Sequence, residues 1–245
     1  MNVPLFNGII VIRPKIIFQK IEEKFPDVNV SFKVNIPSST IGGMTLLENS
    51  ILVALCKLFT PKSLFEFGTY LGATTLLLAE NTISEANVAT VDIEAGDTEN
   101  GDYIGSNTSD LKVLEIGSDN DTYLKINFQN KGAICIDRAA PEIQTKITRM
   151  YQDSKTLDPI SQELNEKFDF ILIDGGHDFE TIKCDTKNAL KMIRPNGIIA
   201  WHDFESKIHS DVTEFLIEYS KNNRIYHVAN SMLAFQLIGN YSDEF

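Results

Sequence analysis

The stretch SLFEFGTYLGATTLLLAEN, residues 63–81, joins an apolar run to a helical run through a loop with two glycines. The first run predicts a buried strand and the second an α-helix. Gly68 allows a sharp turn and the close approach of a ligand, because a Cβ would obstruct both. Gly72 allows the helix to begin beside the strand, where its free N–H groups can hold an anion. The stretch predicts a ligand-binding loop or, as the simpler alternative, a glycine turn that only joins strand to helix.

Four further apolar runs alternate with helical segments after this unit. They are NVATVDI (87–93), KITRMYQ (146–152), FDFILID (168–174) and GIIAWHD (197–203). Strands that alternate with helices predict a parallel sheet with crossover helices. The chain then finishes with the runs RIYHVA and MLAFQLIG, whose short connection predicts an antiparallel hairpin. The pattern as a whole predicts a doubly wound, Rossmann-like α/β fold.

The N-terminal part of the chain lies outside this alternation. The segment PKIIFQKIEEKF predicts a helix, and the alternating apolar residues from Val28 to Val34 predict a strand. Thr45-Leu46-Leu47-Glu48 then matches a capping box and predicts the start of a further helix. We therefore expect an N-terminal extension or cap, residues 1–44, in front of a main domain, residues 45–245.

The main domain contains a long interruption at about residues 95–145. This stretch is rich in Gly, Asp, Asn and Ser. Connections in compact domains are usually about 4–6 residues long, so a stretch of this length is either a functional lid or contains short elements of its own. We interpret it as an insertion after the second strand of the domain.

The composition restricts the partners and the compartment. The chain has 22 Lys and Arg against 34 Asp and Glu, a net charge of −12, so its average surface repels a phosphate backbone. Its three cysteines are odd in number and widely spaced, which indicates reduced thiols in a cytoplasmic protein. No apolar run approaches the ~20 residues that span a bilayer. We expect no nucleic-acid or membrane partner, and association into a homo-oligomer stays open.

Acidic residues stand where three successive strands of the predicted sheet end. Glu66 precedes the glycine loop and can accept a hydrogen bond from a ligand ammonium group. Asp92 ends the next strand, where a carboxylate can accept hydrogen bonds from both ribose hydroxyls. Asp153 and Ser154 follow the third strand and can contact an adenine amino group. Each acid alone is ordinary, but the three together predict a site for a nucleoside-containing ligand.

The fourth and fifth strands end in the segments IDGGHDFE (173–180) and AWHDF (200–204). Adjacent strand ends lie side by side over the binding crevice of such a sheet, so their acids and histidines can converge. One hypothesis is that Asp174, His202 and Asp203 hold Mg²⁺ or a similar divalent cation while His177 acts as general base. A second is that His177 acts without a metal. A third is that Asp174 caps the following helix and the histidines make only local hydrogen bonds.

Together these residues resemble the class I S-adenosylmethionine-dependent methyltransferases. The resemblance covers about residues 45–238 and is strongest for a subgroup with the segments D-G-x-H-x-[YF]-E and P-x-G-x-x-x-x-H-D, which are here residues 174–180 and 195–203. It implies a seven-stranded sheet of order 3-2-1-4-5-7-6 with the last strand antiparallel. It also implies O-methylation, with a cation bound by aspartates in related enzymes. The pair His202-Asp203 departs from the Asp-Asn or Glu-Asp pair of those relatives, which puts Mg²⁺ in doubt.

The predicted site follows from the motifs and the resemblance together. The predicted catalytic residues are Asp174 and His177, and the predicted metal ligands are Asp174, His202 and Asp203. The residues predicted to bind S-adenosylmethionine are Glu66, Gly68, Thr69, Gly72, Thr74, Asp92, Ile93, Asp153, Ser154 and Asp174.

The predicted function is O-methylation of a small hydroxylated acceptor, such as a glycan or a secondary metabolite. The alternatives are a catalytically silent protein that binds S-adenosylmethionine and an enzyme similar to the aminopropyltransferases. An NAD-dependent oxidoreductase ranks last, because the loop lacks the G-x-G-x-x-G fingerprint.

Overall fold

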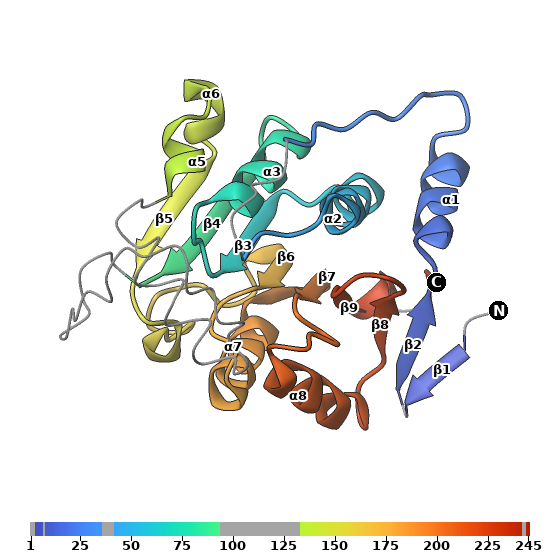
Figure 1. Cartoon of the computed structure of the whole chain (residues 1–245). Helices are drawn as coiled ribbons and strands as arrows, with labels where there is room; N and C mark the ends of the chain where they lie inside the picture. The colour runs from blue at the N-terminus through green and yellow to red at the C-terminus, as the bar shows by residue number, and fades with distance from the viewer. Residues whose placement is uncertain (1–2, 7, 36–41, 94–132, 242–243) are drawn as a thin grey trace, which may run out of the picture.

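A mixed β-sheet of nine strands runs through the centre of the computed structural model, which describes residues 3–6, 8–35, 42–93, 133–241 and 244–245 (Figure 1). The strand order is β1-β2-β8-β9-β7-β6-β3-β4-β5. The strands are β1 (Val3–Phe6), β2 (Ile9–Ile12), β3 (Ser63–Phe67), β4 (Asn87–Asp92), β5 (Ile147–Tyr151), β6 (Phe168–Ile173), β7 (Ile193–Trp201), β8 (Ile225–Val228) and β9 (Ala234–Leu237). The α-helices are α1 (Pro14–Lys24), α2 (Leu46–Phe59), α3 (Ala73–Asn81), α5 (Ile134–Asp137), α6 (Pro141–Gln144), α7 (Phe179–Met192) and α8 (Ser210–Ser220).

Seven of these strands confirm the predicted order. Strands β5, β4, β3, β6, β7, β9 and β8 lie side by side in that order, which is 3-2-1-4-5-7-6 when the strands of the main domain are counted along the chain. Strand β9 is antiparallel to both of its neighbours, β7 and β8, whereas β3, β4, β5, β6 and β7 are mutually parallel. The doubly wound α/β fold is therefore confirmed.

The N-terminal residues extend this sheet by two strands. Strand β2 pairs in parallel with β8, and β1 pairs antiparallel with β2. The predicted helix in PKIIFQKIEEKF is confirmed as α1, which packs on α2. The apolar runs before it are only four residues long, and the sequence pattern does not predict them as strands.

The strand predicted from Val28 to Val34 is wrong. Residues 26–35 contain no strand, and the side chains of Val28 and Phe32 are 64% and 38% exposed. The side chain of Asn81 on α3 takes the place of a strand partner. It accepts a hydrogen bond from the backbone N–H of Lys33 at 2.8 Å and donates one to the carbonyl of Lys33 at 2.7 Å. These alternating apolar residues belong to an extended segment that follows α1, and not to a strand.

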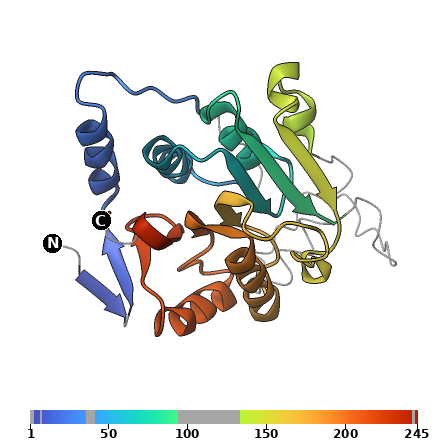
Figure 2. The same cartoon turned by 180° about the vertical axis from the view of Figure 1, so that it is seen from behind.

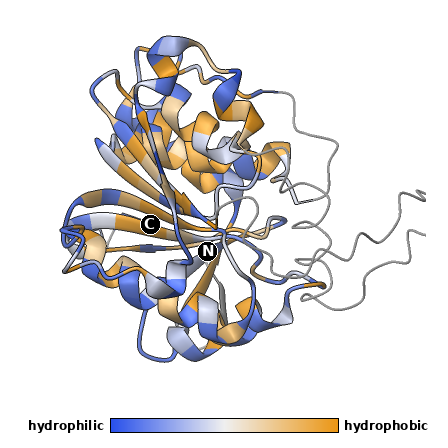
Figure 3. Ribbon diagram, turned by 90° about the vertical axis from the view of Figure 1, so that its left-hand side faces the viewer, coloured by the Kyte–Doolittle hydropathy of each residue, from blue (hydrophilic) through white to orange (hydrophobic). Residues whose placement is uncertain are grey.

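Helices cover both faces of the sheet. Helices α2 and α3 lie on one face and α7 and α8 on the other in both views (Figures 1 and 2). Alternate residues of each strand serve the two faces: Leu64 and Phe170 join the core under α2 and α3, while Phe65 and Ile171 join the core under α7 and α8. Figure 3 shows the hydrophobic stretches of the helices and strands turned toward each other across these layers.

Helix α2 begins at the predicted capping box. The Thr45 side chain accepts a hydrogen bond from the backbone N–H of Glu48, and the Glu48 carboxylate accepts one from the backbone N–H of Thr45. Most of the predicted insertion lies outside the described residues, and its end forms the short helices α5 and α6. Among the helices that the structure describes, none has the length and apolarity needed to cross a membrane.

Candidate active site

The glycine loop connects β3 to α3 and lies against the end of β6. Gly68 has a φ of +91°, and a Cβ at this position would lie 2.1 Å from the carbonyl oxygen of Asp174. Gly72, with a φ of +77°, precedes the first residue of α3, and a Cβ there would lie 2.6 Å from the side chain of Ile136. The loop therefore needs glycine at both positions for packing, whether or not a ligand approaches it.

Asp92 at the end of β4 organises the backbone of this loop. Its carboxylate accepts hydrogen bonds from the backbone N–H groups of Thr69 at 3.0 Å and Tyr70 at 2.7 Å. A third bond comes from the backbone N–H of Ile93 at 2.8 Å. The carboxylate oxygens keep lone pairs for further donors such as hydroxyl groups. Asp92 thus fixes the backbone of the glycine loop.

Glu66 lies under the loop, almost completely buried. Its carboxylate accepts hydrogen bonds from the hydroxyl groups of Thr75 on α3 and Thr90 on β4, the latter at 2.9 Å. The hydroxyl of Thr90 also bonds to that of Thr69 at 2.7 Å. Burial raises the pKa of Glu66 to about 8. The side chain consequently ties β3, β4 and α3 together beneath the position predicted for the ligand.

Asp153 and Ser154 lie at the outer end of this row. Asp153 follows β5 and accepts a hydrogen bond from the backbone N–H of Lys155 at 2.9 Å. Its side chain is exposed, and Ser154 is half-buried. Thr74, in the first turn of α3, is also half-buried. The predicted cofactor residues therefore form a row along the carboxyl ends of β3, β4 and β5.

The strand ends of β6 and β7 bring the predicted acids and histidines together. The His202 Nδ1 atom lies 3.1 Å from Asp174 Oδ1 and 3.1 Å from Asp203 Oδ2. The Nε2 atom of the same ring lies 3.6 Å from Glu48 Oε2. All three carboxylates surround one buried imidazole.

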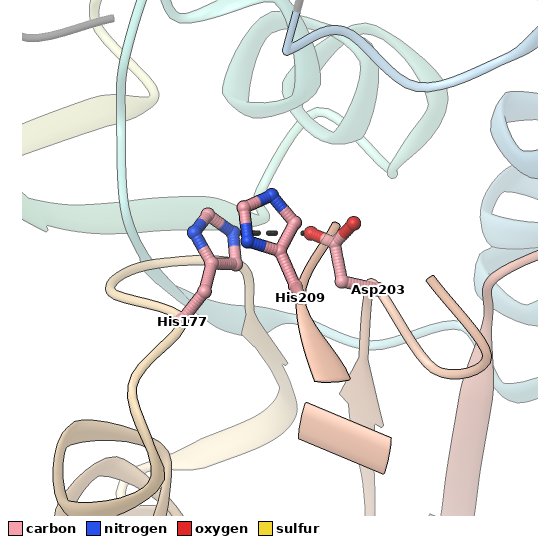
Figure 4. Close-up of side chains that lie close together, drawn as sticks. All are labelled: His177, Asp203 and His209. Atoms are coloured by element: carbon pink, nitrogen blue, oxygen red, sulfur yellow. Dashed lines mark ion pairs between the residues drawn. The ribbon is translucent and has the colours of Figure 1, made fainter. Parts of the chain in front are cut away.

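His177 approaches Asp203 from the loop after β6. Its Nε2 atom lies 3.0 Å from Asp203 Oδ2. The ring of His209 stacks on that of His177, with ring centroids 3.8 Å apart and planes inclined by 23°. Figure 4 shows both imidazoles beside the Asp203 carboxylate. Asp203 has a φ of +63°, a strained conformation for a residue with a side chain, which turns its carboxylate toward these rings.

A sequence model of a family described as a methyltransferase domain matches residues 65–204. The chain belongs to this methyltransferase family. The match spans the glycine loop, the acids at the strand ends and the paired segments that contain Asp174 and Asp203. It confirms the predicted family and the predicted class of enzyme, whereas the motif subgroup stays a prediction.

Solved structures of methyltransferases share the fold. A Klebsiella pneumoniae protein assigned to the O-methyltransferases is 13% identical with a TM-score of 0.50, covering 92% of this chain and 89% of its own. A Staphylococcus aureus protein assigned as a caffeoyl-CoA O-methyltransferase is 11% identical with a TM-score of 0.51, covering 92% of each chain. The Podospora anserina methyltransferase PaMTH1, bound to S-adenosylhomocysteine, is 12% identical with a TM-score of 0.50, covering 91% and 87%. A search of curated proteins finds no match.

The electrostatics of the methyltransferase site favour bound positive charge. Burial alone would lower the pKa of His202, but the carboxylates of Asp174, Asp203 and Glu48 outweigh it and raise the pKa well above its usual range. Burial alone would raise the pKa of Glu48, yet His202 and backbone N–H groups lower it to about 2. Hydrogen bonds from His177 and His202 likewise hold the pKa of Asp203 well below its usual range against the effect of burial. The three carboxylates therefore favour the protonated imidazole of His202.

The structure contradicts the part of the third hypothesis in which Asp174 caps the following helix. Asp178, not Asp174, caps α7, because its side chain accepts a hydrogen bond from the backbone N–H of Thr181 at 3.0 Å. His177 and His202 contact residues of other elements, with Asp203 and Glu48 as their respective partners. His202 also contacts the adjacent residue Asp203, so local and long-range contacts meet in one cluster.

The sequence assigns no site role to three residues of this region. Glu48 is predicted only as part of a capping box, and no role is predicted for His209. Asp185 on α7 is completely buried, and its carboxylate oxygens have no hydrogen-bond partner among the described residues. Burial raises its pKa to about 7. Asp185 lies on the same face of α7 as the buried residues Ile182 and Ala189, and this spacing is the signal in the sequence that its side chain is buried.

We predict that Glu66→Gln stabilises the protein at alkaline pH. The folded-state pKa of Glu66, about 8, is above its ordinary value of 4.5, so the folded protein holds a proton that the unfolded chain releases. The stability that this proton contributes is complete below pH 4.5 and is lost as the pH rises toward 8. Glutamine keeps an acceptor for Thr75 and Thr90 without a charge. Thermal unfolding should show little difference near pH 4.5 and a higher Tm for the variant at pH 8; parallel pH profiles would contradict the prediction.

Proposed function

We propose that the protein is an S-adenosylmethionine-dependent O-methyltransferase that acts on a small hydroxylated acceptor, such as a glycan or a secondary metabolite. The convergence of Asp174, His177 and Asp203 beside the glycine loop carries this proposal. A Cβ on Gly68 would lie 2.1 Å from the carbonyl oxygen of Asp174. The loop that would hold the donor therefore adjoins the strand end that carries Asp174. Family membership supports a methyl transfer at this place.

The donor would lie along the row of predicted cofactor residues. The N–H groups at the start of α3 suit the carboxylate of its methionine moiety. Asp92 at the end of β4 would accept hydrogen bonds from the ribose hydroxyls, and Asp153 and Ser154 after β5 would contact the adenine. Glu66 is buried under the loop and would accept a hydrogen bond from the ammonium group of the donor.

The cofactor supplies an electrophilic methyl group on a sulfonium when it is bound. The side chains of the cluster would then prepare the acceptor oxygen. Because a carboxylate only accepts hydrogen bonds, the contact between His177 Nε2 and Asp203 Oδ2 requires the proton to be on Nε2. With its proton on Nε2 the imidazole is a base at Nδ1, and in this role His177 would take the proton from the acceptor hydroxyl. Asp203 fixes the tautomer and the orientation of the ring.

A divalent cation would be held by Asp174, His202 and Asp203. The ligand atoms of these three side chains lie within 4.8 Å of one another, and two of them lie at 3.1 Å from His202 Nδ1. The spacing and the demand for positive charge fit a cation. It would lower the pKa of an acceptor hydroxyl bound beside His177.

We predict methyl transfer from S-adenosylmethionine to members of a panel of polyols, glycans and phenols. The measurement is release of S-adenosylhomocysteine together with methylated acceptor by mass spectrometry, with and without EDTA. Loss of the reaction in EDTA and its return with a divalent cation would support the cation site. Binding of S-adenosylmethionine without any transfer would favour the silent binding protein, and transfer of an aminopropyl group would favour the second alternative.

A further inference from the structure

His202 lies between two sets of carboxylates, one at each ring nitrogen. Its Nδ1 atom faces Asp174 Oδ1 and Asp203 Oδ2, each at 3.1 Å. Its Nε2 atom faces Glu48 Oε2 at 3.6 Å and is buried without a hydrogen-bond partner within bonding distance in the described part of the chain. The two nitrogens therefore have separate acidic surroundings.

The spacing at Nδ1 matches donors that share one metal ion. Ligands that bind a metal at about 2.0–2.2 Å lie roughly 3.0–3.4 Å from each other in octahedral or tetrahedral geometry. Both carboxylate oxygens lie at such a distance from Nδ1. The arrangement brings a nitrogen and two oxygens to one point with little movement of the side chains.

Glu48 is held rigidly at the opposite edge of the ring. Its side chain is almost completely buried, and its two oxygens accept hydrogen bonds from the backbone N–H of Met232 at 2.7 Å and from the hydroxyl of Thr45 at 2.8 Å. A histidine that binds a metal commonly donates its other N–H to a carboxylate, which fixes the tautomer and increases the basicity of the ligand. Glu48 stands at the position of that carboxylate.

We infer that Glu48 orients His202 so that its Nδ1 atom, with Asp174 and Asp203, binds a divalent first-row transition-metal ion in preference to Mg²⁺. This inference rests on the cation site of the proposed function and names the class of cation. Mg²⁺ takes oxygen ligands and retains several waters. An imidazole nitrogen suits zinc, iron, cobalt and nickel ions. His202, the one nitrogen donor among the three candidate ligands, is thus the residue that sets the choice of metal.

The test compares Co²⁺ and Mg²⁺ binding to full-length protein stripped with EDTA, by calorimetry and by the visible absorption of Co²⁺. Co²⁺ binds more tightly than Mg²⁺ at most protein sites. The ratio of the two affinities in the wild type is therefore compared with the ratio in His202→Asp, whose candidate ligands are all oxygens. We expect His202→Asp to reduce the ratio of Co²⁺ to Mg²⁺ affinity by at least about tenfold and to shift the Co²⁺ absorption. We expect Glu48→Gln to weaken Co²⁺ binding by about 10–100-fold.

Three further variants locate the site. His227 is buried elsewhere, with Nε2 2.9 Å from the carbonyl oxygen of Ser231, so His227→Gln should bind Co²⁺ as wild type does. His177, Asp203 and His209 form a second candidate cluster. Loss of Co²⁺ binding in His209→Ala with retention in His202→Ala would overturn the inference, as would an unchanged metal ratio in His202→Asp. Circular dichroism of each variant monitors its folding.

The same variants separate the failure of this inference from the failure of the proposed function. Calorimetry with S-adenosylmethionine is performed on each of them. Donor binding and methyl transfer by wild type together with absence of Co²⁺ binding would leave the function and overturn the metal inference. Co²⁺ binding through His202 without any methyl transfer would support the metal inference and count against the proposed function.

Discussion

His177→Ala is expected to lower the turnover number for methyl transfer by about 10²–10⁴-fold, the range for loss of a general base. The variant removes the only group that we assign to accept the hydroxyl proton, and it leaves Asp203 without its contact at 3.0 Å. The affinity for S-adenosylmethionine should stay nearly unchanged, because the predicted cofactor residues other than Asp174 lie at the ends of β3, β4 and β5 and at the start of α3. Turnover is measured by release of S-adenosylhomocysteine, and the affinity by calorimetry.

A matched control for this variant is His227→Gln. His227 is also a buried histidine, but its partner is the carbonyl oxygen of Ser231, outside the cluster. The control should retain turnover. Loss of cofactor binding in His177→Ala, or equal loss of turnover in both variants, would contradict the role assigned to His177.

Gly68→Ala is expected to abolish cofactor binding and to destabilise the protein by more than about 3 kcal/mol, which is a lowering of Tm by roughly 6–12 °C for a chain of this size. The new Cβ would lie 2.1 Å from the carbonyl oxygen and 2.7 Å from the carbonyl carbon of Asp174. These atoms belong to the backbone, so β3 and β6 must separate. The φ of +91° adds strain for alanine. Thermal unfolding and calorimetry measure the two effects.

Gly175→Ala provides the control on the neighbouring strand end. Its Cβ would meet Asp185 Oδ2 and the backbone of β3 at 3.5 Å, an ordinary contact distance, and its φ lies outside the left-handed region. This variant should bind S-adenosylmethionine and unfold close to the wild-type temperature. If Gly68→Ala behaved like Gly175→Ala, the packing of the glycine loop against β6 would not have the role described.

The fold was largely predictable because local signals and global topology agree. Each core strand carries an apolar run and each connection a helical pattern, which is sufficient for a doubly wound sheet. The order of the strands came from the resemblance to a family and not from periodicity. Strands β1 and β2 were missed because four apolar residues give no period, and their pairing with β8 depends on distant residues. The wrongly predicted strand near Phe32 is the opposite case, because its residues alternate in polarity but have no partner strand.

The core of the site was predictable for a geometric reason. Asp174 and Asp203 follow adjacent parallel strands, so their proximity follows from the strand order alone. Glu48 reaches the same point from α2, and His209 reaches it through the turn before α8, so tertiary packing decides both. The burial of Glu66 was also not evident, because it depends on Thr75 and Thr90 above and beside it.

A crystal structure of the protein with S-adenosylhomocysteine bound would test the central claim most directly. We expect the amino-acid part of the ligand at Gly68–Gly72, the ribose at Asp92, and the sulfur turned toward Asp174 and His177. A ligand bound elsewhere, or with its sulfur turned away from the ends of β6 and β7, would contradict it.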